Sequence, residues 1–338
     1  MAVPIQGRSL LVCDPHTEAL AAPILGDRDI PRCVLPPGET AKGWASVERI
    51  LAAAAEAGLG RDGLFIALGG GVISDLTAFG ASIFMRGCRL CIISTTLLGM
   101  ADAALGGKTG FDLFGIKNLA GTFYPAEGIY MPLEALASLP QREWKSGMAE
   151  VIKTAILGDR ALMDLLRSPG GDLKGGDLLR THREAVFELI AACVEIKGRI
   201  VEADPRETGT DRALLNLGHT FAHALESAAG LGNLSHGEAV AWGLVRSCEL
   251  GLRLGITPEE RAREISALIR SYGYETAAPH PLMGDGRSFM QALGGDKKKK
   301  AGTLNVVIPA ARRALLVETG PEEQRLLLPL INGALTLC

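Results

Sequence analysis

The feature that most constrains the fold of this chain is an apolar run that ends in three glycines. Leu64–Leu68 is uninterrupted by polar residues, Gly69–Gly71 follow it, and a helical pattern covers Leu76–Phe84. An apolar run of this length that ends in glycines is typical of a strand buried on both faces of a parallel sheet. Ser9–Cys13 and Leu90–Ser94 have the same strand-like character. Strands that alternate with helices predict βαβ units and a sheet covered by helices on both sides.

The pattern changes after Leu139-Pro140, where strand-like runs give way to long amphipathic patterns. These helical patterns cover Glu143–Leu157, Ala161–Arg167, Leu178–Glu202, Ala213–Ala229, Gly237–Leu254 and Pro258–Tyr272. A chain of 338 residues is also long for a single hydrophobic core. We therefore predict an α/β protein with two domains. Residues 1–138 would form a Rossmann-like parallel-sheet domain, and residues 139–338 a mostly α-helical domain.

Composition excludes several classes of partner. The net charge is −3 and the pI about 6.1, which favours neither a nucleic-acid nor an anionic-membrane partner. No apolar run reaches the ~18 residues that span a bilayer, and the N-terminus lacks a secretory pattern, so we expect a cytoplasmic protein. The seven cysteines are odd in number and scattered. Cys88 and Cys91 could form a redox pair, but buried reduced thiols are favoured for all seven.

The glycine turn at Gly69–Gly71 is a candidate phosphate site. Glycines let a backbone approach a ligand closely, and the N-terminus of the following helix offers free N–H groups to phosphate oxygens. The spacing is not G-x-G-x-x-G, and a plain tight turn is the alternative. Ligands of open parallel sheets bind at the carboxyl ends of the strands, which favours the pyrophosphate of a dinucleotide here.

A polar cluster follows the next predicted strand. Asp102, Lys108, Lys117 and Asn118 lie in a glycine-rich stretch. Ammonium, amide and carboxylate groups together can bind a phosphorylated, polyhydroxylated anion. The alternative is a solvated loop whose lysines face water.

Three histidines and a glutamate form a candidate metal site. His219 and His223 lie four residues apart, His236 follows, and Glu150 precedes them. Imidazole and carboxylate ligands are typical of a catalytic divalent-metal site with one position open for substrate. Both His219 and His223 could be ligands, since residues four apart share a helix face, or one could be a ligand and the other a general acid or base. Thr220 replaces the glutamate of H-E-x-x-H, which disfavours a metalloprotease.

Nine segments occur in an order that is recognisable. They are Gly69–Leu76, Thr95–Leu98, Gly106–Thr109, Lys117–Asn118, Leu139–Glu143, Ala149–Lys153, Leu214–Thr220, His236–Val240 and Asp296–Lys298. Together they resemble the 3-dehydroquinate synthases, the founding family of the sugar phosphate cyclases. The resemblance extends from about residue 10 to about residue 310.

The resemblance implies a lyase that depends on NAD and on zinc or cobalt, usually a homodimer. Its small-molecule substrate would be 3-deoxy-D-arabino-heptulosonate 7-phosphate, and its products 3-dehydroquinate and phosphate, in the shikimate pathway of aromatic amino acid biosynthesis. NAD would oxidise one alcohol transiently, phosphate would leave by elimination, and re-reduction and an intramolecular aldol step would follow.

The resemblance also implies roles for individual residues. The implied metal ligands are Glu150, His219 and His236, with His223 left for proton handling. The implied NAD contacts are Asp14, Glu39, Lys42, Gly70, Gly71, Asp75, Thr95, Thr96, Lys117 and Ser138. The implied substrate contacts are Arg86, Asp102, Lys108, Asn118, Lys153, Lys197, Arg212, Asn216 and Lys297.

The chain departs from the family at several points. Ala103 and Ala104 replace two serines, Phe111–Ile116 differs from the usual stretch, Ala222 replaces a glycine, and the Arg212 segment carries a one-residue insertion. Family members usually carry further residues before the segment that matches Ser9–Cys13. These departures bear most on the identity of the substrate.

Three other functions are compatible with parts of the pattern. A sibling cyclase would act on sedoheptulose 7-phosphate or glucose 6-phosphate, which lack a carboxylate. The retained Lys197, Arg212, Asn216 and Lys297 favour the keto acid instead. A metal-dependent polyol dehydrogenase would accumulate NADH and has less need of these cations, and a non-catalytic binding protein would not need every ligand.

Overall fold

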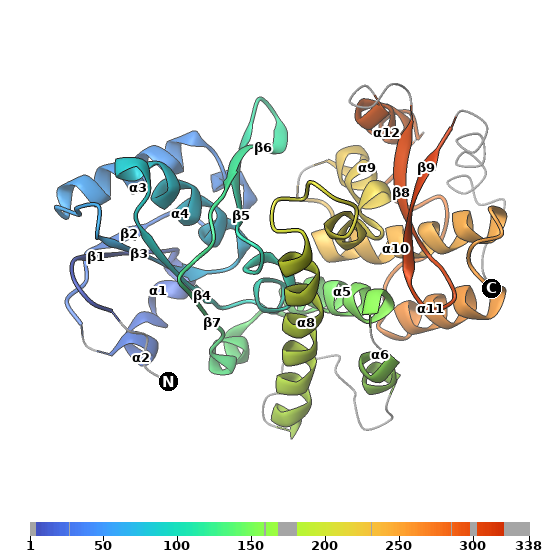
Figure 1. Cartoon of the computed structure of the whole chain (residues 1–338), viewed down its shortest axis with the longest axis horizontal. Coiled ribbons are helices and arrows are strands. Elements are labelled where there is room, and N and C mark those ends of the chain that lie inside the picture. Colours follow the sequence, from blue (N-terminus) through green and yellow to red (C-terminus); the bar gives the residue numbers. More distant parts are fainter. Residues whose placement is uncertain are drawn as a thin grey trace. The chain divides into compact units, whose positions relative to one another are not determined.

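The computed structural model describes residues 5–26, 28–158, 160–167, 181–230, 232–284, 286–297 and 303–320, without the side chains of residues 294–297. The chain divides into two compact units, Met1–Pro140 and Gln141–Cys338 (Figure 1). The first carries a parallel sheet and the second is mostly helical, as the sequence predicts.

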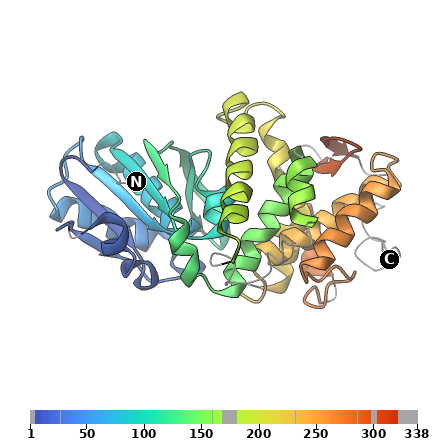
Figure 2. The ribbon, with the colours of Figure 1, turned by 90° about the horizontal axis from the view of Figure 1, so that it is seen from below.

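The sheet of the first unit has the strand order β2-β1-β3-β4-β7, and every neighbouring pair is parallel. Its strands are β1 (Ser9–Cys13), β2 (Arg32–Val34), β3 (Leu64–Gly69), β4 (Arg89–Ser94) and β7 (Gly128–Tyr130). Figure 2 shows these strands lying side by side. The order reverses between β1 and β3, which makes a doubly wound sheet. In sheets of this kind ligands generally bind at the carboxyl ends of the strands beside the reversal.

The two faces of the sheet are buried by different helices. Leu10 and Phe65 face α3 (Trp44–Glu56) and α4 (Gly71–Ile83) in one hydrophobic cluster. The alternate residues Leu11 and Ile66 face α2 (Ala21–Leu25) in another. A side-chain period of two and burial on both sides explain why these strands are apolar throughout.

The remaining elements of the first unit are a short helix, several turns and one hairpin that the sequence did not predict. They are α1 (Pro15–Glu18), a π turn at Gly99–Ala103, short 3-10 turns at Glu39–Ala41, Phe84–Arg86 and Leu133–Ser138, and the antiparallel pair β5 (Lys108–Leu113) and β6 (Ile116–Phe123). The alternative of a solvated loop for this cluster is therefore wrong for Lys108, Lys117 and Asn118, which lie in the hairpin. The hairpin is hard to recognise because most of β6 is exposed, whereas Phe111 of β5 is buried with its ring 5.0 Å from that of Phe79.

The second unit consists mainly of helices. They are α5 (Gln141–Gly158), α6 (Arg160–Arg167), α8 (Arg183–Ala203), α9 (His219–Ala229), α10 (His236–Arg253), α11 (Glu259–Ser271) and α12 (Arg287–Lys297), with a 3-10 turn at Arg212–Asn216. A hairpin of β8 (Leu304–Pro309) and β9 (Ala314–Thr319) packs beside α10 (Figure 1). Leu304 and Ile308 share a core with Phe221 and Trp242.

Two predictions for this unit are wrong in detail. Strands do not disappear after residue 140, because β8 and β9 are present. The helix predicted over Ala213–Ala229 is interrupted, because Gly218 adopts a φ of 80°, a left-handed conformation that ends one helical segment before α9 begins.

Six cysteines lie in the part of the chain that the structure describes. All are buried and none is in a disulfide: Cys13, Cys33, Cys88, Cys91, Cys193 and Cys248. Burial raises the pKa of Cys91 to about 12, which argues against a reactive thiol there. Across the same residues, every helix is too short or too polar to cross a membrane.

Candidate active site

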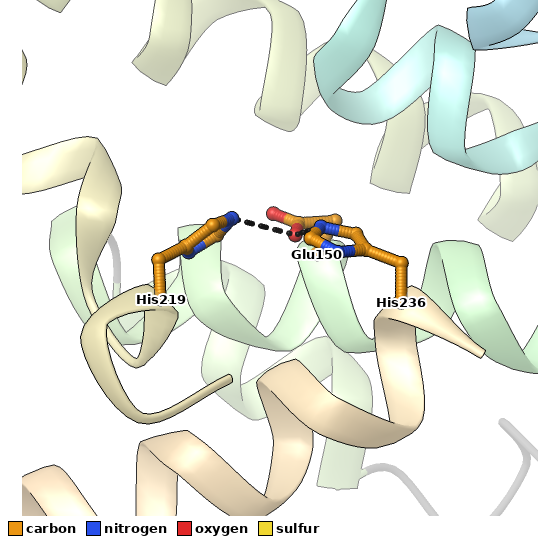
Figure 3. Close-up of side chains that lie close together, drawn as sticks. All are labelled: Glu150, His219 and His236. Atoms are coloured by element: carbon orange, nitrogen blue, oxygen red, sulfur yellow. Dashed lines mark ion pairs between the residues drawn. The ribbon is translucent and has the colours of Figure 1, made fainter. Parts of the chain in front are cut away.

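Three side chains from three helices of the second unit point toward one another (Figure 3). Glu150 lies in α5, His219 is the first residue of α9, and His236 is the first residue of α10. The Nε2 atoms of His219 and His236 lie 3.5 and 3.2 Å from Oε1 of Glu150. Their candidate ligand atoms all fall within 4.8 Å of one another. The structure thus brings together the three residues that the sequence predicts as metal ligands.

Glycines set the close approach of these helices. Gly237 donates its N–H to Oγ of Ser146 at 3.0 Å, and a Cβ atom at Gly237 would overlap the backbone of Ser146. A Cβ atom at Gly243 would overlap the carbonyl oxygen of Gly218. The first contact places the start of α10 against α5, and the second places the start of α9 against α10. Local backbone contact therefore explains why His219 and His236 both reach Glu150.

The carboxylate at the centre is completely buried but charged. Its Oε2 lies 2.5 Å from Nζ of Lys153, and both side chains are at most 1% exposed. Burial by itself would raise the pKa of Glu150, but Lys153 and the two histidines hold it well below its usual range. An anion buried this deeply is stable only beside positive charge.

The two histidines differ in charge when no metal is bound. Burial, with help from Lys153, lowers the pKa of His219 to about 3, so that its ring is neutral. Burial also disfavours the charged form of His236, but its contacts with Glu150 and Glu226 outweigh this and raise its pKa to about 10. His236 is therefore the proton-bearing ring at neutral pH.

The donor set fits a divalent transition metal. One carboxylate and two imidazoles are ligands that zinc and cobalt accept, and three protein ligands leave room for substrate. The ion would take the place of the proton on His236 as the positive partner of Glu150.

His223 lies near this group without joining it. Its side chain is exposed, and its ring centroid is 5.4 Å from that of His219 and 6.5 Å from that of His236. The geometry therefore groups His236 rather than His223 with His219. A ring beside the metal group that retains solvent contact is suited to moving protons.

Other predicted residues of the second unit are mostly buried. Lys197 in α8 is 7% exposed and Arg212 is 1% exposed. Arg212 donates from its guanidinium to the carbonyl oxygen of Pro205 at 2.5 Å, and Asn216 donates to Oε1 of Glu207 at 3.4 Å. Lys297 ends α12, and its side chain lies outside the described part of the structure.

In the first unit, several predicted NAD contacts lie where the strands end. Asp14 follows β1 and caps α1 by accepting from the N–H groups of His16 and Thr17. Gly70 and Gly71 follow β3 and open α4, which begins five residues before the helix predicted there. A Cβ atom at Gly70 would lie 2.9 Å from the side chain of Thr96, so a larger residue would crowd this turn.

Thr95 and Thr96 follow β4 in the same way. The N–H of Thr95 donates to the carbonyl oxygen of Gly69 at 3.0 Å, and Oγ1 of Thr96 accepts from the N–H of Gly99 at 3.0 Å. The glycine turn and the threonines are thus held against each other by backbone contact. This arrangement leaves the helix N-terminus of α4 at the carboxyl edge of the sheet.

A buried ion pair lies beside this turn. Nζ of Lys42 is 2.6 Å from Oδ2 of Asp75, and Lys42 is 5% exposed. Burial lowers the pKa of Lys42, but Asp75 and Glu39 raise it more, so the lysine stays charged. The carbonyl oxygen of Lys42 also accepts from the N–H of Asp112 at 2.7 Å, which ties the β5–β6 hairpin to this pair.

The remaining predicted residues of the first unit are more accessible. Asp102 is half-buried in the π turn. The exposed ones are Arg86, Lys108, Lys117, Asn118 and Ser138. Arg86 and Asn118 have left-handed φ values of 68° and 52°, and the N–H of Asn118 donates to Asp112 at 2.8 Å. Asparagine adopts this conformation more readily than arginine does.

Two carboxylates that sequence reasoning missed contact predicted site residues. Oε1 of Glu226 is 3.5 Å from Nδ1 of His236, and Glu207 contacts Asn216 as described above. Glu226 follows His219 by two helical turns and so lies on the same face of α9. That spacing was a signal for Glu226, whereas nothing in the sequence pattern pointed to Glu207.

Comparison with known proteins shows two family matches that together cover most of the chain. Residues 32–146 match the family described as 3-dehydroquinate synthase N-terminal, and residues 147–299 match the one described as 3-dehydroquinate synthase C-terminal. The 3-dehydroquinate synthase of Pseudoalteromonas atlantica is 41% identical over 282 residues, which cover 83% of this chain and 77% of that protein. The enzyme of the same name from Colwellia psychrerythraea is 39% identical and covers 85% and 79%.

Solved structures agree with the fold. The 2-epi-5-epi-valiolone synthase of Streptomyces hygroscopicus, solved with NAD+ and Zn2+ bound, is 28% identical with a TM-score of 0.83, and the match covers 96% of this chain and 90% of that one. A probable glycerol dehydrogenase from Sinorhizobium meliloti shares the fold at 18% identity, with a TM-score of 0.65 and coverage of 97% and 91%.

Proposed function

Because the chain belongs to the 3-dehydroquinate synthase family, we propose that it converts 3-deoxy-D-arabino-heptulosonate 7-phosphate to 3-dehydroquinate and phosphate. The observation that carries the proposal is the group of Glu150, His219 and His236, with the buried cation of Lys153 beside it. A site that pairs a candidate metal with buried positive charge suits an anionic, polyhydroxylated substrate.

In this proposal Glu150, His219 and His236 hold zinc or cobalt, and the carboxyl edge of the first unit holds NAD. Bound NAD would supply a reversible oxidation of a substrate alcohol, and the bound ion would polarise the oxygen concerned. The protein's contribution is to fix three ligands on rigid helices and to keep Glu150 ionised. The ion pair with Lys153 offsets the cost of burying the carboxylate and keeps it ionised.

The proposed NAD site consists of the backbone at the start of α4 and the polar side chains around it. The free N–H groups at the start of α4 bind the pyrophosphate, and Gly70 and Gly71 let it approach. The residues proposed to surround the rest of the cofactor are Asp14, Glu39, Lys42, Asp75, Thr95, Thr96, Lys117 and Ser138. The ion pair of Lys42 with Asp75 supports this placement because it holds two polar side chains rigid at the turn.

The cations of the second unit are proposed to bind the substrate's carboxylate. Lys197 and Arg212 are buried, and a bound anion stabilises cations that have been removed from water. Lys153 and Asn216 lie with them in the second unit, and Lys297 is proposed from the sequence alone. The proposed contacts in the first unit are Arg86, Asp102, Lys108 and Asn118. His223 is proposed to help transfer the proton that the substrate loses when phosphate is eliminated.

The test is phosphate release from 3-deoxy-D-arabino-heptulosonate 7-phosphate with zinc and a catalytic amount of NAD. We expect many turnovers of phosphate per NAD and no lasting rise in NADH absorbance, because the oxidation is reversed within each cycle. Arg212→Lys serves as a matched variant that keeps the charge but loses the planar fork, and it should raise KM for this substrate. Absence of phosphate release from this substrate, with folded and metal-loaded protein, would refute the proposal.

A sibling cyclase activity on sedoheptulose 7-phosphate is the second candidate. It is favoured by the valiolone synthase structure, which matches 96% of this chain at a TM-score of 0.83. Because that sugar lacks a carboxylate, its turnover should not depend on Lys197 or Arg212. Parallel assays with both sugar phosphates on the wild type and Lys197→Met separate the two activities. Accumulation of NADH with a simple polyol would instead indicate a dehydrogenase.

The proposal includes three properties that the family resemblance suggests. The metal is zinc or cobalt, the protein is a homodimer, and it acts in the cytoplasm. Elemental analysis of protein purified without added metal tests the first, and sedimentation equilibrium tests the second. Fractionation of cells that express the tagged chain tests the third.

A further inference from the structure

The two histidines of the metal group are held in the same orientation by different partners. Each has Nε2 directed at Glu150, at 3.5 Å for His219 and 3.2 Å for His236. Nδ1 of His219 lies 3.2 Å from the carbonyl oxygen of Leu217. Nδ1 of His236 lies 3.5 Å from Oε1 of Glu226. An acceptor at Nδ1 fixes the hydrogen there and leaves the Nε2 lone pair for a metal.

We propose that Glu226 is a positioning residue that holds His236 in the tautomer and orientation needed to bind the metal through Nε2. The inference rests on the proposed metal role of His236. Glu226 belongs to α9 and His236 begins α10, so the contact joins the two helices that carry the histidine ligands. Its side chain is only 9% exposed, which limits competition from water for its oxygens.

The difference in exposure between the two histidines explains why the partner of His236 is a carboxylate. His219 is fixed by a backbone carbonyl two residues earlier, and the turn at Gly218 sets the position of that carbonyl. His236 is the more exposed ring, at 31% against 12% for His219. A ring with more freedom needs a stronger acceptor to stay in place, and a carboxylate also makes the imidazole a better donor to the metal.

The experiment measures metal affinity directly, without substrate. Zinc affinity of the wild type, Glu226→Gln and Glu226→Ala is determined by competition with a chromophoric chelator. Loss of an outer-shell partner typically weakens binding by about 10–100-fold, which we expect for Glu226→Ala. Glu226→Gln keeps an acceptor oxygen without the charge and should fall between the two. Glu202→Gln, an exposed site at the end of α8, is the charge-matched control and should bind zinc like the wild type.

Absorption spectra of the cobalt-loaded proteins provide a second measurement. A ring that rotates out of position changes the ligand field, so the visible bands of Glu226→Ala should shift while those of Glu202→Gln should not. Zinc affinities of both Glu226 variants within about twofold of the wild type, with unchanged cobalt spectra, would overturn the proposal. If Glu226→Ala fails to fold by circular dichroism, the isosteric Glu226→Gln decides by the same two criteria.

These outcomes separate the inference from the proposed activity. Normal zinc affinity in the wild type with no phosphate release would refute the cyclase activity and leave the role of Glu226 intact. Failure of the wild type to bind either zinc or cobalt would overturn both.

Discussion

Two buried ion pairs in the second unit have the same sequence spacing but different neighbouring groups. Glu150 and Lys153 lie three residues apart in α5, and Arg246 and Glu249 lie three apart in α10, with every side chain at most 1% exposed. Arg246 donates to Glu249 at 3.0 Å and to the carbonyl oxygen of Thr276 at 2.8 Å. Glu150 instead faces two imidazole rings.

The difference separates a structural use of buried charge from a functional one. Arg246 also lies 4.9 Å above the ring of Trp242, whose N–H donates to the carbonyl oxygen of Ala277 at 2.8 Å. The charge of this pair holds the segment around Thr276 against α10. The Glu150 pair brings further ligand atoms to the same carboxylate, and such an arrangement can exchange a proton for a metal ion.

The largest expected effect is on the structural pair. Glu249→Gln leaves Arg246 buried without its anion, so we expect a loss of about 3–5 kcal/mol in the free energy of unfolding. Zinc affinity at Glu150 should stay the same. Urea unfolding and chelator competition measure the two quantities. A stable Glu249→Gln protein with weakened zinc binding would reverse the distinction between the pairs.

The second effect is the loss of a direct ligand. Glu150→Gln should weaken zinc binding by more than ~100-fold, because a direct ligand contributes more than an outer-shell partner. His223→Asn, on the same helix as His219, is the matched control and should keep wild-type zinc affinity. Equal losses in the two variants would show that His223 is also a ligand.

The third effect divides metal binding from turnover. Lys153 competes electrostatically with a metal for Glu150, so Lys153→Met should raise zinc affinity by about tenfold or more, which corresponds to about 1.4 kcal/mol or more. Turnover should nevertheless fall, because the proposed substrate contact is lost. Chelator competition and phosphate release measure the two. A parallel fall in both would assign Lys153 a purely structural role like that of Arg246.

The fourth effect is a pH dependence of the metal-free protein. Between pH about 3 and 6.5 the unfolded chain binds a proton at His219 that the folded chain does not, so stability should rise with pH. Between 6.5 and about 10 the folded chain binds a proton at His236 that the unfolded chain does not, so stability should fall. We expect a maximum near pH 6.5 in urea unfolding. His236→Gln should flatten the alkaline arm and His219→Gln the acid arm, and unchanged arms would contradict the assignment.

The fifth effect concerns two helical glycines. Gly237→Ala would push α10 away from Ser146, and we expect a loss of about 1–3 kcal/mol in unfolding free energy together with weaker zinc binding. Gly198 in α8 has open space where the methyl group of an alanine would lie, so Gly198→Ala should stabilise by about 0.5–1 kcal/mol. Thermal unfolding of both variants compares them. A neutral Gly237→Ala would show that the helix contact does not position the centre.

The sequence predicted what local pattern controls. The continuous apolar runs at Leu64–Leu68 and Leu90–Ser94 are strands because both of their faces are buried. The β5–β6 hairpin was missed because its side chains do not alternate between buried and exposed in a recognisable way. The β8–β9 pair was overlooked, although Leu304–Pro309 is a mostly apolar run of strand length.

The sequence predicted which residues form the candidate metal group, but their grouping in space came from the structure. Helical spacing alone left His219 and His223 as equal alternatives. The grouping with His236 depends on the turn at Gly218 and on the contact of Gly237 with Ser146, which lies 91 residues away in the chain. Such contacts leave no periodic signal. Glu226 escaped notice because its partner lies on another helix, although its spacing of two helical turns from His219 was present in the sequence.

The buried cysteines can report transient local unfolding of the structure around them. Cys13, Cys33, Cys88 and Cys91 lie in the first unit, and Cys193 and Cys248 lie in the second. If Cys338 is replaced by serine, a thiol reagent can react only with these six buried cysteines. Its rate of reaction with each then depends on how often the surrounding structure opens. Mass spectrometry of the labelled peptides then counts the openings of the sheet and of the helices separately. The two sets of rates would reveal whether the units open independently or as one cooperative body.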